Sequence, residues 1–143
     1  IRELWDKHEI RKLHAELQDK IRKEHCDFLS DLRERSPDVI IRSAYMIVTT
    51  DQISMYMRLY ESPLSAKEYK ALLSSENTLM EIYEEWNSHD DWTDMEDMGY
   101  AMEKAAESIQ YSIDRKEDKI AEKMTASHSQ KEQEQKQKHY PKR

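Results

Sequence analysis

Residues 10–32 read IRKLHAELQDKIRKEHCDFLSDL, and this stretch determines what kind of fold the chain forms. Apolar or weakly polar side chains recur in it at intervals of three or four residues, and charged or polar residues hold most of the positions between them. The recurring positions are Ile10, Leu13, Leu17, Ile21, His25, Phe28 and Leu32. This spacing places one apolar stripe along one face of an α-helix. Because residues 2–35 contain no glycine or proline, we predict one long first helix over 2–35 with coiled-coil character.

The rest of the chain is punctuated as a series of helices. One glycine and three prolines among 143 residues are too few for the turns of a β-rich fold. Ser36-Pro37 starts a second helix, Ser65-x-x-Glu68 is a capping box, and Thr93-x-x-Glu96 is a second capping box. We interpret Thr49-Thr50-Asp51 as a break or kink. The predicted fold is all-α, with about five helices, in which long first and last helices pack on a compact helical middle.

The apolar positions predict a small core and one domain. In the middle of the chain, the predicted core residues are Val39, Ile40, Ile47, Leu72, Leu79, Ile82 and Trp86. A long last helix follows residue 93, but Lys116 and Glu117 interrupt its apolar stripe, so we expect its last turns to project from the domain. From Ser127 onward there is no apolar face, which is typical of disorder or of a lone solvated helix. We therefore predict one helical domain over 1–126 and a basic tail over 127–143.

Negative charge is concentrated in residues 61–103. This segment has twelve acids and two bases, a net charge of −10 in a chain whose total is −7. Such a concentration repels nucleic acid and attracts basic surfaces, although a charged segment more commonly forms only a solvated face. Direct binding of nucleic acid is not expected, because the bases elsewhere are mixed with acids. The predicted partner-binding residues are Glu81, Glu84, Glu85, Asp90, Asp91, Trp92, Asp94, Glu96 and Asp97.

The sequence lacks the motifs of catalysis and of cofactor binding. Gly99 alone cannot supply the two or more glycines of a phosphate loop, a dinucleotide fingerprint or a nucleophile elbow. The cluster His89-Asp90-Asp91 lacks the glycine and the terminal Glu of a calcium loop, so we interpret it as a solvated loop in preference to a loose cation site. We expect no enzymatic activity, no cofactor and no metal.

Localisation follows from two further absences in the sequence. Cys26 is the single cysteine, so no internal disulfide forms, and a reducing cytoplasm is the simple interpretation. No apolar run approaches the ~18 residues of a membrane-spanning helix. We therefore expect a cytoplasmic protein without a membrane segment.

The tryptophans have different predicted roles. Trp86 lies on the apolar face of its helix and is assigned to the core. Trp92 follows two acids and precedes Thr93, so it is either a hydrophobic staple for the next helix or an interface anchor among carboxylates. Trp5 is a candidate anchor for an oligomeric or partner contact through the first helix.

Four stretches in the middle of the chain carry a family resemblance. They are SPDVII (36–41), KALL (70–73), NTLMEIYEEW (77–86) and the acidic segment 91–97. Over about residues 15–103 the chain resembles a small helical domain family of Firmicutes that is found on conjugative and phage-like elements. Members of that family carry Pro-Leu after the Asn, whereas Thr78 stands here. The resemblance implies a small accessory protein of a mobile genetic element and supplies no catalytic residue.

Two classes of function follow. In the first, the chain is a non-enzymatic inhibitor of a defence nuclease, of the anti-CRISPR or anti-restriction type. Its carboxylates would stand in for phosphates on a basic surface such as that of a Cas9-type nuclease. In the second, it is a structural or regulatory coiled-coil adaptor that self-associates as a homo-oligomer through its first and last helices, and the acids keep it in solution.

Overall fold

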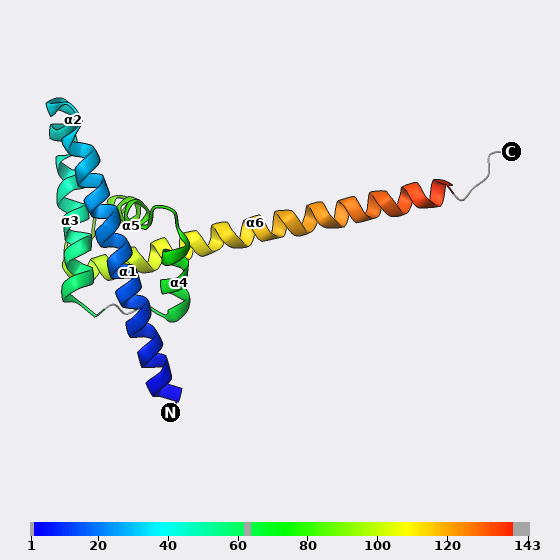
Figure 1. The fold of residues 1–143 in the computed structure, drawn as a ribbon, viewed down its shortest axis with the longest axis horizontal. Coiled ribbons are helices and arrows are strands. Elements are labelled where there is room, and N and C mark those ends of the chain that lie inside the picture. Colours follow the sequence, from blue (N-terminus) through cyan, green and yellow to red (C-terminus); the bar gives the residue numbers. More distant parts are fainter. Residues whose placement is uncertain (1, 62–63, 139–143) are drawn as a thin grey trace. The chain divides into compact units, whose positions relative to one another are not determined.

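The computed structural model describes residues 2–61 and 64–138, with side chains as far as residue 131. These residues form six α-helices and no strand (Figure 1). The helices are α1 (Arg2–Arg33), α2 (Pro37–Arg42), α3 (Ala44–Leu59), α4 (Ala66–Ser74), α5 (Thr78–Asn87) and α6 (Met95–Lys138). The predicted all-α fold is confirmed.

The chain divides into two compact units, Ile1–Ile109 and Gln110–Arg143, and α6 contributes to both. We call the first unit the body. The domain predicted from the sequence ends at residue 126, and the predicted tail begins at 127. In the structure the described tail residues, 127–138, are helical. Between residues 110 and 131 no side chain is buried.

The stripe of α1 organises the body. Helix α1 packs against α3, α4 and α5. Leu17 and Ile21 are fully buried, and Leu13 and Leu32 are nearly so. Burying a large aliphatic side chain contributes about 1.5–3 kcal/mol, so these positions supply much of what holds the four helices together. The stripe ends before the first turns of the helix, where Leu4 is 71% exposed.

The break in the second helical segment lies at Ser43, not at Thr49-Thr50-Asp51. Helix α3 runs without interruption through these three residues, so the predicted kink there is wrong. The Thr50 hydroxyl donates to the Met46 carbonyl oxygen at 2.8 Å, one turn back along the helix. Because this bond satisfies its hydroxyl, Thr50 can be buried inside a helix, where its neighbour Thr49 is buried too.

The core matches only part of the predicted set. Leu72, Leu79, Ile82 and Trp86 are buried, but Ile40 and Ile47 are half-buried and Val39 is exposed. Val39 and Ile40 lie on α2, which buries no residue, and Ile47 is half-buried because α3 turns a different face inward than its most apolar residues suggest. That inward face is made of Thr49, Thr50, Ile53, Tyr56 and Met57. From α6, the buried residues are Met98, Ala101, Met102, Ala105, Ala106 and Ile109.

One predicted capping box is present, whereas the predicted Thr93-x-x-Glu96 box is absent and Asp97 makes one of the two capping-box hydrogen bonds, one residue further along. Ser65 and Glu68 form both reciprocal hydrogen bonds of a capping box at the start of α4. At the start of α6, Asp97 replaces Glu96, because its carboxylate accepts from the backbone N–H groups of Thr93 and Asp94, each at 3.0 Å. The helix begins at Met95, so the acid three residues after the capping position Asp94 is Asp97.

Two leucines of α1 test how much the body depends on this stripe. We expect Leu17→Ala to lower the free energy of unfolding by about 2–5 kcal/mol, because it leaves a cavity in the packed core. Leu4→Ala, the same substitution at an exposed site of the same helix, should change it by less than about 0.5 kcal/mol. Urea unfolding followed by circular dichroism measures both. Equal effects at the two positions would contradict the packing described here.

Candidate protein-interaction surface

A carboxylate of α1 holds the start of α5. Glu24 accepts the backbone N–H of Thr78 at 2.8 Å and that of Leu79 at 3.4 Å. Its side chain is 16% exposed, and Lys20 lies 3.3 Å away as its ion-pair partner. A negative charge among the free N–H groups of a helix N-terminus is favourable. The long first helix therefore fixes the position at which α5 begins.

Thr78 ties the same point to α4. Its hydroxyl donates to the Leu72 carbonyl oxygen, near the end of α4, while its N–H donates to Glu24. A proline at this position has neither group. The Asn77 side chain accepts the N–H of Met80 and completes the cap.

The nine predicted partner-binding residues lie on α5, on the loop 88–94 and on the first turn of α6. They divide by exposure into two groups. Half-buried side chains belong to Glu81, Glu85, Trp92 and Asp97. Exposed side chains belong to Glu84, Asp90, Asp91, Asp94 and Glu96. We call these five exposed carboxylates the acidic surface.

Two of the half-buried acids have structural contacts. Glu85 accepts a hydrogen bond of 2.9 Å from the Ser108 hydroxyl, which joins α5 to α6 within the body. Its second oxygen is 4.0 Å from His89 Nε2, a contact that becomes an ion pair when the imidazole is protonated. Asp97 caps α6, as described above. Both residues help to hold the acidic surface in place.

Trp92 packs on its own loop. Its ring lies 3.7 Å from that of His89, centroid to centroid, with 19° between the ring planes. The Trp86 ring is 6.4 Å away and tilted by 39°. Through these contacts Trp92 links the loop to α5.

The acids of this region have no lysine or arginine partners among the described residues. None of the six ion pairs within 4.0 Å joins an acid between residues 81 and 97 to a lysine or arginine. Acids elsewhere do pair, as Asp31 does with Arg35 and Glu107 with Lys104. Partial burial, together with the neighbouring Glu84 and Glu85, raises the pKa of Glu81 above its ordinary value. The region therefore carries negative charge that no lysine or arginine among the described side chains neutralises.

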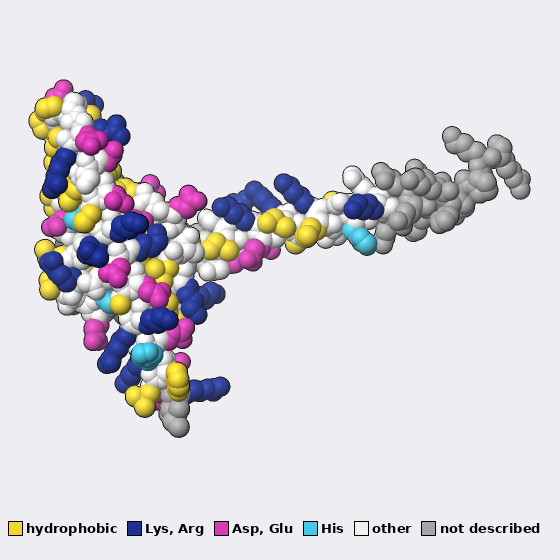
Figure 2. Space-filling model, viewed as in Figure 1, with side chains coloured by type: hydrophobic (Ala, Val, Ile, Leu, Met, Phe, Trp, Pro, Cys, Tyr) yellow, Lys and Arg dark blue, Asp and Glu magenta, His cyan; other side chains and the backbone are white. Residues whose placement is uncertain are grey.

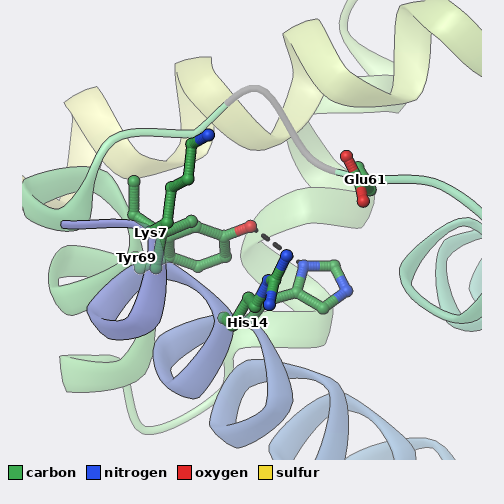
Figure 3. Close-up of a pocket in the computed structure, with 6 residues that line it drawn as sticks. Lys7, His14, Glu61 and Tyr69 are labelled. Carbon is green, nitrogen blue, oxygen red and sulfur yellow. Dashed lines mark hydrogen bonds between the residues drawn. The ribbon is translucent and has the colours of Figure 1, made fainter. Parts of the chain in front are cut away.

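A cavity of about 400 Å³ lies elsewhere on the body, lined by Lys7, Ile10, Arg11, His14, Glu61 and Tyr69 (Figure 3). The Tyr69 hydroxyl and His14 Nδ1 are 2.9 Å apart, and His14 Nε2 is 2.9 Å from the Met57 carbonyl oxygen. Since a carbonyl only accepts, Nε2 donates to it, and in the neutral ring Nδ1 accepts from the tyrosine. Both nitrogens of His14 are thus used to join α1 to α3 and α4, which makes this histidine a structural residue.

The described residues also contain neither a metal-binding cluster nor a helix that could span a membrane. Within the part of the chain that the structure describes, no three His, Cys, Asp or Glu side chains are grouped so that they could hold a metal ion. Across the same residues, none of the helices has both the length and the apolar character needed to cross a membrane.

The raised pKa of Glu81 predicts a pH-dependent stability. The folded chain holds this proton more tightly than the unfolded chain, so the ionised carboxylate costs stability at neutral pH. The cost disappears as the pH falls below 4.5, the ordinary value, where both states are protonated. We expect Glu81→Gln to raise the melting temperature at pH 7 and to have little effect at pH 4. Glu96→Gln, at an exposed position, is the control. A lowered melting temperature of the Glu81 variant at pH 7 would contradict this assignment.

Comparison of the chain with protein-family models, with curated proteins and with solved structures finds no match in any of the three. The resemblance of residues 15–103 to a family from mobile genetic elements stays a prediction.

Proposed function

We propose that this chain is a non-enzymatic protein that binds a basic surface of a protein partner through its acidic surface. The observation that carries the proposal is the absence of lysine or arginine partners for the carboxylates between residues 81 and 97, within the described residues. Partial burial, and after it repulsion from Glu84 and Glu85, raises the pKa of Glu81, so the ionised carboxylate costs stability in the isolated chain. A partner with lysines and arginines would relieve that cost.

The placement of the acids supports specific binding. Glu24 caps α5 from α1, and Asp97 caps α6, so the two helices that carry the acids begin at fixed points. Because the backbone that carries these exposed carboxylates is already ordered, binding has to immobilise only their side chains, which favours affinity. Their negative charge argues against nucleic acid as the preferred partner, because phosphates would be repelled.

The proposed partner is a nucleic-acid-targeting defence nuclease in the cytoplasm, and the chain would be its inhibitor, of the anti-CRISPR or anti-restriction type. The basic channel in which such a nuclease holds its nucleic acid is complementary in charge to the acidic surface. The resemblance to proteins of mobile genetic elements supports the same class.

A second candidate function has support in α6. Ile113, Ile120 and Met124 share one face of this helix, at spacings of seven and four residues. Ile120 is 57% exposed and Met124 is 70% exposed. Such a face is typical of helices that pair, so a coiled-coil adaptor that self-associates through the last helix is the alternative.

Neutralising the acidic surface tests the first proposal. We expect binding of the purified protein to a Cas9-type nuclease, with and without guide RNA, to weaken by about tenfold or more when four carboxylates lose their charge. The variant is Asp90→Asn, Asp91→Asn, Asp94→Asn and Glu96→Gln. A matched control removes the same charge from exposed acids of α1: Glu3→Gln, Asp6→Asn, Glu16→Gln and Asp27→Asn. Equal losses in the two variants, or no binding at low salt by the unaltered protein, would argue against the proposal.

The α6 face is tested by Ile120→Lys combined with Met124→Lys. If the chain is an adaptor of the second kind, this variant should lose self-association in light scattering, because two lysines cannot pack in an apolar seam. An inhibitor of the first kind should keep its affinity for the nuclease. Loss of nuclease binding in this variant would point to α6, and not to the acidic surface, as the binding element.

A further inference from the structure

An apolar stripe on α3 is largely exposed, although the Tyr45 ring lies 6.4 Å from the Tyr83 ring of α5, centroid to centroid. The stripe consists of Tyr45, Val48, Gln52, Met55 and Leu59 of α3, at spacings of three, four, three and four residues, and Ile41 of α2 precedes it across the break at Ser43. Three of the five are exposed, Tyr45 by 56%, Val48 by 56% and Leu59 by 63%, and Ile41 is exposed by 71%. Figure 2 shows hydrophobic side chains along the edge that α2 and α3 form, at the left of the view. This spacing is that of a helix seam that packs against another helix.

The stripe is additional to the face that α3 already buries. Thr49, Thr50, Ile53, Tyr56 and Met57 occupy the inward face of the same helix. An α-helix buried on one side ordinarily presents polar residues on the other. Scattered apolar residues on a surface need no explanation, whereas a continuous row marks an interaction site.

A groove beside the stripe contains a buried polar atom without a hydrogen-bond partner among the described residues. It has a volume of about 550 Å³ and lies between α1 and α3, where its lining includes His25, Val48, Asp51 and Met55. The Nε2 atom of His25 is buried and has no hydrogen-bond partner among the described residues. A buried polar atom left unpaired costs about 1–3 kcal/mol, which a covering partner could offset.

The charged residues beside the stripe indicate which partner packs on it. Asp51 and Arg58 lie seven residues apart, two helical turns, and therefore flank the stripe on the same side. If a second α3 runs antiparallel to the first, with Val48 packed on Leu59 and Gln52 beside Met55, each Asp51 lies close to an Arg58 of the other copy. Two ion pairs then form across the interface. A parallel arrangement gives neither residue an opposite charge.

We propose that the α2–α3 face is the interface of a two-fold symmetric homodimer in which the two α3 helices pack antiparallel. The same patch serves both copies, as a two-fold axis requires. The stripe supplies the apolar centre of the interface, and the reciprocal pairs of Asp51 with Arg58 fix its orientation. The acidic surface and α6 beyond residue 109 contribute no residue to this interface.

The mass in solution and a reciprocal charge exchange test the proposal. Sedimentation equilibrium of the full chain should give twice the monomer mass of 17.2 kDa. Asp51→Arg or Arg58→Asp alone should raise the dissociation constant of the dimer by about tenfold or more, because each places like charges together. The double variant Asp51→Arg/Arg58→Asp should restore dimerisation. Val48→Lys should give monomers, and the urea midpoint of each variant, taken at a fixed low concentration, shows that it folds.

Three outcomes would overturn the proposal: a monomer throughout a dilution series, a dimer that neither charge variant weakens, or a dimer that only Ile120→Lys/Met124→Lys dissociates. The last outcome would assign self-association to α6. The dimer proposal and the proposed function can be tested independently. Neutralising Asp90, Asp91, Asp94 and Glu96 should leave the mass of the dimer unchanged.

Discussion

Burial of the α1 stripe against α3, α4 and α5 is the interaction on which the rest of the body depends. Leu17 and Ile21 lie at its centre and are fully buried. Polar contacts from the same face of α1 then set how each neighbour sits. His14 binds the Met57 carbonyl and the Tyr69 hydroxyl, and Glu24 binds the first N–H groups of α5. Apolar burial thus supplies the energy, and the polar contacts supply the specificity of the arrangement.

The contact of Glu24 links this packing to the proposed function. Partial burial of Glu81, together with repulsion from Glu84 and Glu85, raises the pKa of this carboxyl group and costs stability at neutral pH. Helix α5 therefore keeps its position only because other contacts stabilise it. The buried Leu79, Ile82 and Trp86, together with the cap from Glu24, provide them. Stability spent on a charged surface is common where that surface serves a function.

The sequence predicts the features that depend on local pattern. The stripe of α1, the capping box at Ser65 and the apolar face of α5 follow from spacing alone, and the structure confirms each of them. The errors concern orientation and register. Thr49-Thr50 resembles a break, yet the Thr50 hydroxyl bonds within α3. Val39 is apolar but exposed, because no rule of spacing states which side of a short helix faces the core.

The contacts that position the acidic surface are the least predictable, because they join distant parts of the chain. Glu24 lies more than fifty residues before the N–H groups that it caps. In the sequence, this contact is indicated only by the position of Glu24, an acid three residues after Ile21 at the side of the apolar stripe. His14, a polar residue between Leu13 and Leu17, gives a similar indication of a contact between helices. Polar residues on an apolar face are therefore the positions to inspect for contacts between helices.

The most direct test of the central claim, that the unpaired acids form an attractive surface at one place on the body, is an NMR titration. The ¹⁵N-labelled protein would be titrated with a short lysine-rich peptide at low salt and again at high salt. The account predicts chemical-shift changes concentrated between residues 84 and 97 that fade as salt is added. Changes spread over the acids of α1 and α6 in equal measure would contradict it.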